Sequence, residues 1–576
     1  MTLEPEVDRR ARRIALQNAL EHGGAPRAGP IVSRLLAETP ALRRTAPAVQ
    51  AAVDAIIGEV ASLDAAAQAS ALAALGGAVE TAEPRRADRP EMPPLPGAVD
   101  GQVVLRMAPF PSGALHIGNA RMIYVNEHYR ARYHGRLLLV IDDTIGSEEK
   151  RVDLEMIDGI RRDLELAEVR PDATFFKSDR VPRFYPWARR VIEAGGAYVC
   201  VCPAGLLRER RAQGTACPER SQTVPETLEG WDRMLAGGYG PGEAVLRLRT
   251  DLADPDPAFR DRVLFRVSDV EHPRVGHKYR VWPMLEFSWA VDDLELGMTH
   301  VLRGKDLVIE DRMQEYIWRL LGLTGPQFIH WGILRVREAK IAKSKASAEV
   351  RSGLFDGWAD PRSWSLASLD RRGITTAALR QFTLSFGLSL ADIEVPAETL
   401  YAENRAIIDP TTPRRAFVED PVAVHVDGFP DDLAEVELPN HPDRPELGRR
   451  RVATGPTFFL ARSDLAPRLG TEVRLKDLAN VALPAGPLPA AGAALAAQFT
   501  SRENRRIPRL QWVGAARAVP VDLLGLEGEH HLGVAEGAVA DARPRDQFQF
   551  ERVGFVRIEA SWTPGTAPVR VCFGHP

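Results

Sequence analysis

The sequence predicts a multidomain α/β protein with a helical N-terminal segment, a core built on a parallel sheet and β-barrels at the C-terminal end. Its 576 residues exceed what one hydrophobic core holds, because domains usually contain roughly 100 to 200 residues. From Val103 onward, apolar strand-like segments alternate with amphipathic helical ones, which is typical of a sheet covered by helices on both faces. Beyond about residue 411, short strand patterns are separated by Pro, Gly and Asp turns.

Composition restricts the class of protein. With 45% hydrophobic and 26% charged residues, the chain resembles an ordinary globular protein. A formal net charge of −4 argues against a uniformly basic nucleic-acid-binding surface, although local basic grooves remain compatible with it. Four cysteines cannot form a disulfide scaffold, and the first residues lack the apolar centre of a signal peptide, so we expect a cytoplasmic protein.

The N-terminal segment, residues 1–97, is predicted to be helical. Apolar residues recur at helical spacing within 7–24, 31–42 and 49–75, and a stretch rich in proline and glycine follows. No motif that carries chemistry is present in this segment.

The α/β core is predicted from four strands and two helices. The strands are expected at 103–107, 136–141, 299–303 and 331–336, and the helices at 153–166 and 182–194. Since ligands of such sheets bind at the carboxyl ends of the strands, the turn that follows the first strand is the leading candidate for a binding site.

That turn has the residues expected of a phosphate-binding site. Pro, Ser and Gly follow the strand, and His116-Ile-Gly-Asn119 then begins a helix whose backbone N–H groups suit an anion. His116 and Asn119 lie one turn apart, so both side chains are expected on one face as donors to phosphate, while Gly118 leaves room for a nucleotide. Alternatively, His116 merely caps a helix in a common type of turn.

The stretch PFPSGALHIGNAR resembles the first signature of the class I aminoacyl-tRNA synthetases, and the archaeal type of glutamyl-tRNA synthetase is the most similar group. Further matches follow in the same order as in that family. They are DDT at Asp142–Thr144, HPRVGHKYRVWP from His272, THVLRGKD from Thr299, a lysine loop near Lys345 and YAENRAIIDP from Tyr401.

The resemblance implies a domain order. A Rossmann-like catalytic domain would occupy 98–340, with an inserted acceptor-binding region at about 197–270. A lysine loop and a helical stem-contact region, expected as helix over 365–400, would fill 341–410, and anticodon-binding β-barrels would fill 411–576. It also implies a reaction in which L-glutamate and ATP, with Mg²⁺, form an adenylate that is transferred to the 3′ end of tRNA(Glu), by an enzyme expected to be a monomer.

Roles for individual residues follow from the resemblance. Catalytic roles are implied for His116, Asn119, Lys345 and Lys343, and ATP-binding roles for Pro109, Ser112, Gly113, Gly118 and Ser344. Amino-acid-binding roles are implied for Arg106, Ser112, Asp142, Leu285 and Arg303. KIAKS matches the second signature letter by letter with Lys343 as its lysine, but the surrounding alignment without gaps favours Lys345.

The arginines indicate which amino acid is used. A guanidinium group matches both oxygens of a carboxylate, so Arg106 and Arg303 predict a substrate with a second carboxylate, and two such buried groups would be left unpaired by a neutral side chain. Three departures from the family pattern point elsewhere: Asn119 replaces a usual histidine, Val140 a usual arginine and Leu285 a usual tyrosine. A paralogous ligase with another amino acid or a non-tRNA acceptor, and a non-catalytic tRNA-binding relic, therefore remain as alternatives.

A metal site is possible in the inserted region. Cys200, Cys202, Cys217 and Glu219 resemble the zinc element of the family, with glutamate in the position of a usual Cys or His. Three reduced, partly buried thiols are the alternative.

Arginines in the C-terminal part suggest RNA binding. The residues are Arg414, Arg415, Arg449, Arg450, Arg451, Arg502, Arg505 and Arg506.

Overall fold

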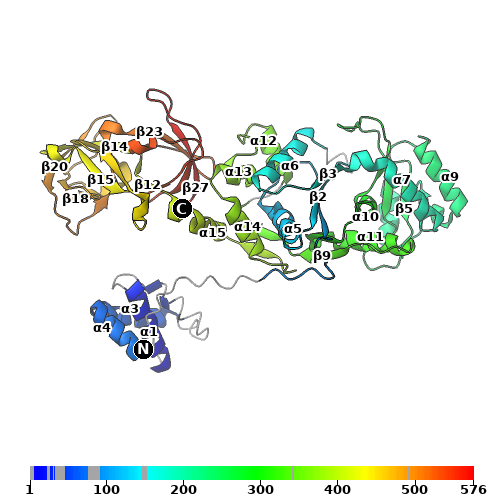
Figure 1. Ribbon diagram of the computed structural model, residues 1–576, viewed down its shortest axis with the longest axis horizontal. Coiled ribbons are helices and arrows are strands. Elements are labelled where there is room, and N and C mark those ends of the chain that lie inside the picture. Colours follow the sequence, from blue (N-terminus) through cyan, green and yellow to red (C-terminus); the bar gives the residue numbers. More distant parts are fainter. Residues whose placement is uncertain are drawn as a thin grey trace. The chain divides into compact units, whose positions relative to one another are not determined.

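The computed structural model describes residues 5–21, 26, 28–29, 31–32, 35, 46–75, 91–145, 152–339, 343–490 and 492–576 (Figure 1). The chain divides into two compact units, residues 1–89 and residues 90–576. Among the described residues, no helix combines the length and the apolar character needed to cross a membrane.

The first unit is helical, as predicted. Its helices are α1 (Pro5–Glu21), α3 (Ala46–Ala61) and α4 (Ala65–Ala74), and they share a core that includes Ile14, Ile56 and Leu72. The single helix expected over 49–75 is wrong, because Asp64 caps a new helix by accepting the backbone N–H of Ala67 at 2.8 Å. The helix expected over 31–42 lies mostly outside the described residues.

The core of the second unit has the predicted alternation of strands and helices. Strands β1 (Val104–Met107), β2 (Arg136–Ile141) and β3 (Ala173–Phe176) form a parallel sheet, and β8 (His300–Gly304) and β9 (Gln327–Trp331) form a parallel pair. Thr299 joins β8 to β1, because its N–H donates to the Val104 carbonyl at 3.1 Å. The accompanying helices are α5 (Ala120–Arg132), α6 (Leu154–Leu166), α7 (Lys177–Glu193), α10 (Leu285–Glu295) and α11 (Val308–Leu320).

Two predicted elements of this core differ from the structure. Helix α7 begins at Lys177, five residues before the proline that was expected to start it, and contains Pro182 and Pro186. The strand expected over 331–336 is interrupted after Trp331, where a side chain on Gly332 would lie 2.0 Å from the Ala391 carbonyl oxygen. The chain resumes as β10 (Leu334–Val336), which pairs in parallel with β11 (Ile393–Val395).

A second, antiparallel sheet is inserted into the core. It consists of β4 (Ala197–Cys200), β5 (Val245–Leu248), β6 (Val263–Val267) and β7 (Val281–Pro283), with α8 (Ala204–Gln213) and α9 (Val224–Leu235) in its connections. Trp231, Phe265 and Phe287 pack edge to face in its core.

A mostly helical region follows the core. It contains α12 (Lys343–Arg351), α13 (Leu366–Arg371), α14 (Thr376–Leu384) and α15 (Glu398–Ile408). The helical prediction for 365–400 is wrong at β11, which serves as the partner of β10.

The C-terminal part contains two seven-stranded, barrel-like sheets, which confirms the predicted fold class. One, the β14 sheet, has the order β21 (Arg509–Leu510), β18 (Glu472–Leu475), β19 (Asn480–Ala482), β20 (Leu495–Ser501), β14 (Pro421–Asp427), β17 (Thr457–Ala461), β22 (Val513–Gly514). The other, the β27 sheet, has the order β12 (Arg414–Arg415), β25 (Gln547–Phe550), β26 (Gly554–Ile558), β27 (Val569–His575), β23 (Val519–Leu524), β24 (His530–Ala535), β13 (Phe417–Glu419). A separate hairpin, β15 (Glu435–Pro439) and β16 (Arg449–Ala453), belongs to neither sheet.

Candidate active site

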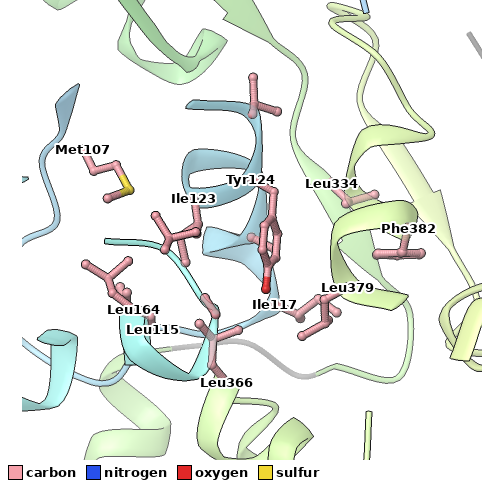
Figure 2. Close-up of a cluster of buried hydrophobic side chains, with 14 of the residues drawn as sticks. Met107, Leu115, Ile117, Ile123, Tyr124, Leu164, Leu334, Leu366, Leu379 and Phe382 are labelled. Atoms are coloured by element: carbon pink, nitrogen blue, oxygen red, sulfur yellow. The ribbon is translucent and has the colours of Figure 1, made fainter. Parts of the chain in front are cut away.

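The turn after β1 is anchored by apolar side chains on both sides of His116. Figure 2 shows Leu115 and Ile117 in one buried cluster with Tyr124 of α5 and Leu379 of α14. Backbone bonds add to this anchoring, because the Ile117 N–H donates to the Trp364 carbonyl at 3.1 Å and the Leu366 N–H donates to the Leu115 carbonyl at 2.9 Å. The segment around His116 is therefore held by the core helix and by the later helical region together.

His116 and Asn119 do begin a helix, but both side chains bond to the backbone of the turn, whereas the sequence predicted that both would donate to phosphate. His116 Nδ1 accepts the N–H of Gly118 at 3.0 Å, and the His116 N–H donates to Asn119 Oδ1 at 3.2 Å, which is a reciprocal cap of the short helix η2 (Ile117–Asn119). Because Nδ1 is an acceptor, the neutral imidazole carries its proton on Nε2. The His116 ring can thus donate from Nε2, whereas the Asn119 oxygen is used to shape the turn.

A buried carboxylate supports the same turn from α6. Asp163 Oδ2 accepts the backbone N–H of Leu115 at 2.7 Å, and the side chain is 4% exposed. Burial raises the pKa of Asp163 to about 7, although the bond from Leu115 and the nearby Arg162 oppose that rise.

One pocket of about 620 Å³ lies at the carboxyl ends of β1, β8 and β9. It brings together four residues singled out from the sequence, namely Arg106, His116, Gly118 and Arg303, and it is also lined by Trp289 and Trp331. Pro109, Ser112, Gly113, Asn119, Asp142 and Leu285 are not among its lining residues. The structure does not describe the side chains of Lys343, Ser344 and Lys345, so the roles of these residues stay predictions.

Arg106 and Arg303 each have an internal acidic partner. Arg106 forms a two-pronged ion pair with Asp293, with N–O distances of 2.5 and 3.0 Å. Arg303 Nη2 donates to Asp311 and, at 2.6 Å, to Gln314. The expectation that a neutral substrate would leave both guanidinium groups unpaired is therefore wrong, because Asp293 and Asp311 already compensate their charge.

Asp142 also has a cation that the sequence did not reveal. Lys177, buried at the first position of α7, lies with Nζ 3.6 Å from Asp142 Oδ1 and donates to Ser288 Oγ at 2.7 Å. Burial lowers the pKa of Lys177, while Asp142 opposes that change. An amino group held by Asp142 would have to share this carboxylate with Lys177, and no periodicity or motif marks Lys177 in the sequence.

The four residues of the suggested metal site lie together beside β4. Ligand atoms of Cys200, Cys202, Cys217 and Glu219 all lie within 4.8 Å of one another. Burial raises the pKa of the Cys200 and Cys202 thiols, so both are protonated at neutral pH unless a cation is bound. Three sulfurs and one carboxylate oxygen at this spacing fit a tetrahedral Zn²⁺ ion.

Comparison with known proteins identifies the family. A sequence model described as tRNA synthetases class I (E and Q), catalytic domain, matches residues 102–409, and models of the anti-codon binding domain match residues 412–486 and 509–559. Glutamate–tRNA ligase of Methanothermobacter marburgensis is 39% identical over 554 residues, covering 95% of this chain and 97% of that protein. The chain belongs to the class I glutamate–tRNA ligase family. The glutamate–tRNA ligase of Methanosarcina mazei is 36% identical over 97% of this chain and 98% of its own length, and that of Pyrococcus furiosus is 37% identical over 96% and 97%.

Membership of the glutamate–tRNA ligase family gives context to the C-terminal arginines, which fall into two groups. Arg414 and Arg450 are buried and pair with Asp409 and Glu536 at 2.5 Å, and Arg415 lies 3.7 Å from Glu536. These three pair with acidic side chains of the protein, and their contact with RNA stays a prediction. Exposed positions remain at Arg449, Arg451, Arg502, Arg505 and Arg506.

Proposed function

We propose that this chain activates L-glutamate with ATP and transfers the glutamyl group from the adenylate to the 3′ end of tRNA(Glu). The observation that carries the proposal is one pocket that His116, Gly118, Arg106 and Arg303 all line, in a chain that matches glutamate–tRNA ligases over nearly its full length. The ATP site would lie against the His116 turn, and the amino acid would lie toward the two arginines.

The first step needs donors rather than a protein nucleophile. The α-carboxylate of glutamate attacks the α-phosphorus of ATP and expels pyrophosphate, so negative charge is redistributed over phosphate oxygens. His116 Nε2–H would donate to these oxygens, with Lys345, and secondarily Lys343, donating from the signature loop. Mg²⁺ bound with ATP would neutralise further phosphate charge.

The inserted sheet and the barrels would bind the tRNA. We infer that the region of about 197–270 contacts the acceptor end, that the helices between 341 and 410 contact the stem, and that the barrel-like sheets bind the anticodon. Single-stranded anticodon bases suit recognition by stacking and hydrogen bonding. The exposed arginines would provide contacts to phosphates, and we expect a monomer that acts in the cytoplasm.

We also propose that Cys200, Cys202, Cys217 and Glu219 hold a structural Zn²⁺ ion. The zinc would tie the end of β4 to the loop that carries Cys217. Arg247 lies beside this site, with Nη1 3.0 Å from the Cys217 sulfur.

A second candidate is a paralogous ligase that activates another amino acid. It is supported by Leu285 and Val140, which place apolar side chains where the family usually has polar ones, and by the internal pairing of Arg106 and Arg303. A neutral substrate would not leave a free guanidinium charge in this pocket.

Amino-acid-dependent exchange between ATP and pyrophosphate separates the two candidates. We expect exchange with glutamate, measured with and without tRNA, and at least tenfold weaker exchange with each of the other nineteen amino acids. Preference for glutamine or an apolar amino acid would establish the second candidate, and no exchange with any amino acid would favour a non-catalytic tRNA-binding protein.

A further inference from the structure

Four buried nitrogen donors on residues that line the pocket form no hydrogen bond among the described residues: Arg121 Nε, Trp289 Nε1, Arg303 Nε and Arg303 Nη1. The last three belong to two side chains in contact with each other, Trp289 and Arg303. Both residues line the pocket and are almost fully buried, at 4% and 6% exposure. Since nearly all buried polar groups in proteins are hydrogen-bonded, three orphaned donors on two adjoining side chains indicate a missing acceptor.

Trp289 is in contact with three buried cations, Arg106, Lys177 and Arg303. The Arg106 and Arg303 guanidinium carbons lie 4.7 and 4.9 Å from its ring centroid, and Lys177 Nζ lies at 4.9 Å. Arg303 also lies 4.8 Å from the ring of Phe328, so aromatic rings contribute much of its surroundings. Such contacts hold a guanidinium group in place without using its N–H groups.

The acidic partners of Arg106 and Arg303 do not accept hydrogen bonds from Trp289 Nε1, Arg303 Nε or Arg303 Nη1. Asp293 binds Arg106, and Asp311 binds Arg303 through Nη2 only. Among the described residues, no carboxylate accepts a hydrogen bond from Arg303 Nε, from Arg303 Nη1 or from the Trp289 indole N–H.

We propose that Trp289 is a specificity-determining residue of the amino-acid site, and that its indole N–H donates, together with Arg303 Nε and Nη1, to the side-chain carboxylate of glutamate. This inference rests on the proposed function, because it names the substrate group that this part of the pocket receives. The three nitrogens are covered in the structure, so the carboxylate reaches them through a rotation of the indole.

The donor set selects a carboxylate over a carboxamide. A carboxylate has two oxygens and only accepts hydrogen bonds, so it satisfies several donors at once. The carboxamide of glutamine offers one oxygen and presents an NH₂ group, which would face further N–H groups. Discrimination between glutamate and glutamine thus depends on the indole N–H as well as on arginine.

Trp289→Phe tests the indole N–H while keeping an aromatic face for the cations. In pyrophosphate exchange, we expect the KM for glutamate to rise at least tenfold, kcat to change less than threefold, and the preference for glutamate over glutamine to fall at least tenfold. Trp289→Leu, which also removes the aromatic face, should lower the preference further.

Trp318→Phe is the matched control. Trp318 is also buried, lies next to Phe328 and donates its N–H to the Ala290 carbonyl at 2.8 Å, but it does not line the pocket. We expect its loss to lower the melting temperature and to leave both the KM for glutamate and the amino-acid preference within twofold of wild type.

NMR spectra of the wild-type protein test the proposed role of the Trp289 indole N–H without a substitution. Of the indole N–H resonances of the ten tryptophans, one should move downfield in ¹⁵N–¹H spectra when glutamate saturates the enzyme, and not with 2-aminobutanoate, which lacks the side-chain carboxylate. An unchanged set of indole resonances, or a Trp289→Phe enzyme whose KM and preference stay within twofold of wild type, would overturn the inference and leave the glutamate ligase activity standing. A wild-type protein without glutamate-dependent exchange would overturn both.

Discussion

At the scale of single residues, Arg303 is the side chain on which amino-acid choice is expected to depend most. Arg106 uses Nε and Nη2 for Asp293, whereas Arg303 gives only Nη2 to Asp311 and Gln314. Burial and the nearby Arg106 lower the pKa of Arg303. Keeping the guanidinium group charged therefore costs free energy, and the attraction of Asp311 offsets this cost.

Arg303→Lys should therefore reduce the preference for glutamate over glutamine by about tenfold or more while preserving the fold. Lysine keeps a positive charge beside Asp311 but lacks the planar fork. The ratio of kcat/KM for the two amino acids measures the effect. Arg303→Ala should additionally destabilise the protein, because it leaves His330, 2.5 Å away, as the remaining partner of the buried Asp311 carboxylate. An unchanged preference in both variants would contradict the assignment.

The choice between Lys345 and Lys343 is also a residue-scale question. We expect Lys345→Ala to slow adenylate formation by two or more orders of magnitude, since one preorganised donor to developing charge is worth roughly 3 to 4 kcal/mol. Lys343→Ala should have a smaller effect in the same single-turnover assay. The reverse order would show that the letter-by-letter match KIAKS has the correct register.

At the scale of elements, α6 stabilises the signature turn through a carboxylate whose pKa is raised to about 7. A pKa above the ordinary value means that the folded state binds the proton more tightly than the unfolded state does. The stability from Asp163 is therefore complete at pH values below about 4 and is lost as the pH rises to about 7.

Asp163→Asn should remove this dependence, because the amide oxygen still accepts the Leu115 N–H and carries no charge. Between pH 5 and pH 8, the free energy of unfolding of wild type should fall relative to that of the variant by about 1 kcal/mol or more, as measured in denaturant. Asp158→Asn is the control on the same helix, since Asp158 is exposed and pairs with Arg161 at 3.2 Å. A difference that changes in the opposite direction would show that the turn requires the ionised carboxylate.

The proposed zinc site in the inserted antiparallel sheet offers a second test at the scale of elements. The purified protein should contain about one equivalent of zinc, and removal of the metal by a chelator should lower the melting temperature by several degrees. Cys217→Ser should lose the metal, whereas Cys572→Ser, at the fourth and distant cysteine, should keep it. Less than a tenth of an equivalent of metal in wild type would leave three reduced thiols as the explanation.

Elements whose conformation depends on neighbouring residues were predicted well from the sequence, whereas features that depend on residues far along the chain were not. Strand β2 and the start of η2 follow from short-range patterns and were predicted closely. The interruption at Gly332 depends on Ala391, and the support of Leu115 depends on Asp163, 48 residues later, so neither leaves a local signal. Trp289 was missed because an apolar residue in a helix is ordinarily part of a core.

At the scale of the whole molecule, the two compact units have separate hydrophobic cores. The apolar cluster of α1, α3 and α4 lies entirely within residues 1–89. A protein lacking residues 1–89 should therefore fold and retain glutamate-dependent exchange within about threefold of the full chain, because every described pocket residue lies beyond position 89. A loss greater than tenfold with an intact fold would show that the helical unit takes part in adenylate formation.

The order of strands in the two barrel-like sheets sets an order of folding during synthesis. The β14 sheet has all of its strands once Gly514 has left the ribosome, whereas β12 and β13 of the β27 sheet must wait for partners in β25 and β24, which are made more than a hundred residues later. Pairings that close such long loops form late. Strand β27 follows the other strands of both sheets in the chain, and its Gly574 carbonyl accepts a hydrogen bond from the buried Arg372 next to α13. This bond between the helical region and the β27 sheet therefore forms only after residue 574 has been made. A nascent chain interrupted before that residue would carry a complete β14 sheet and a helical region without this bond.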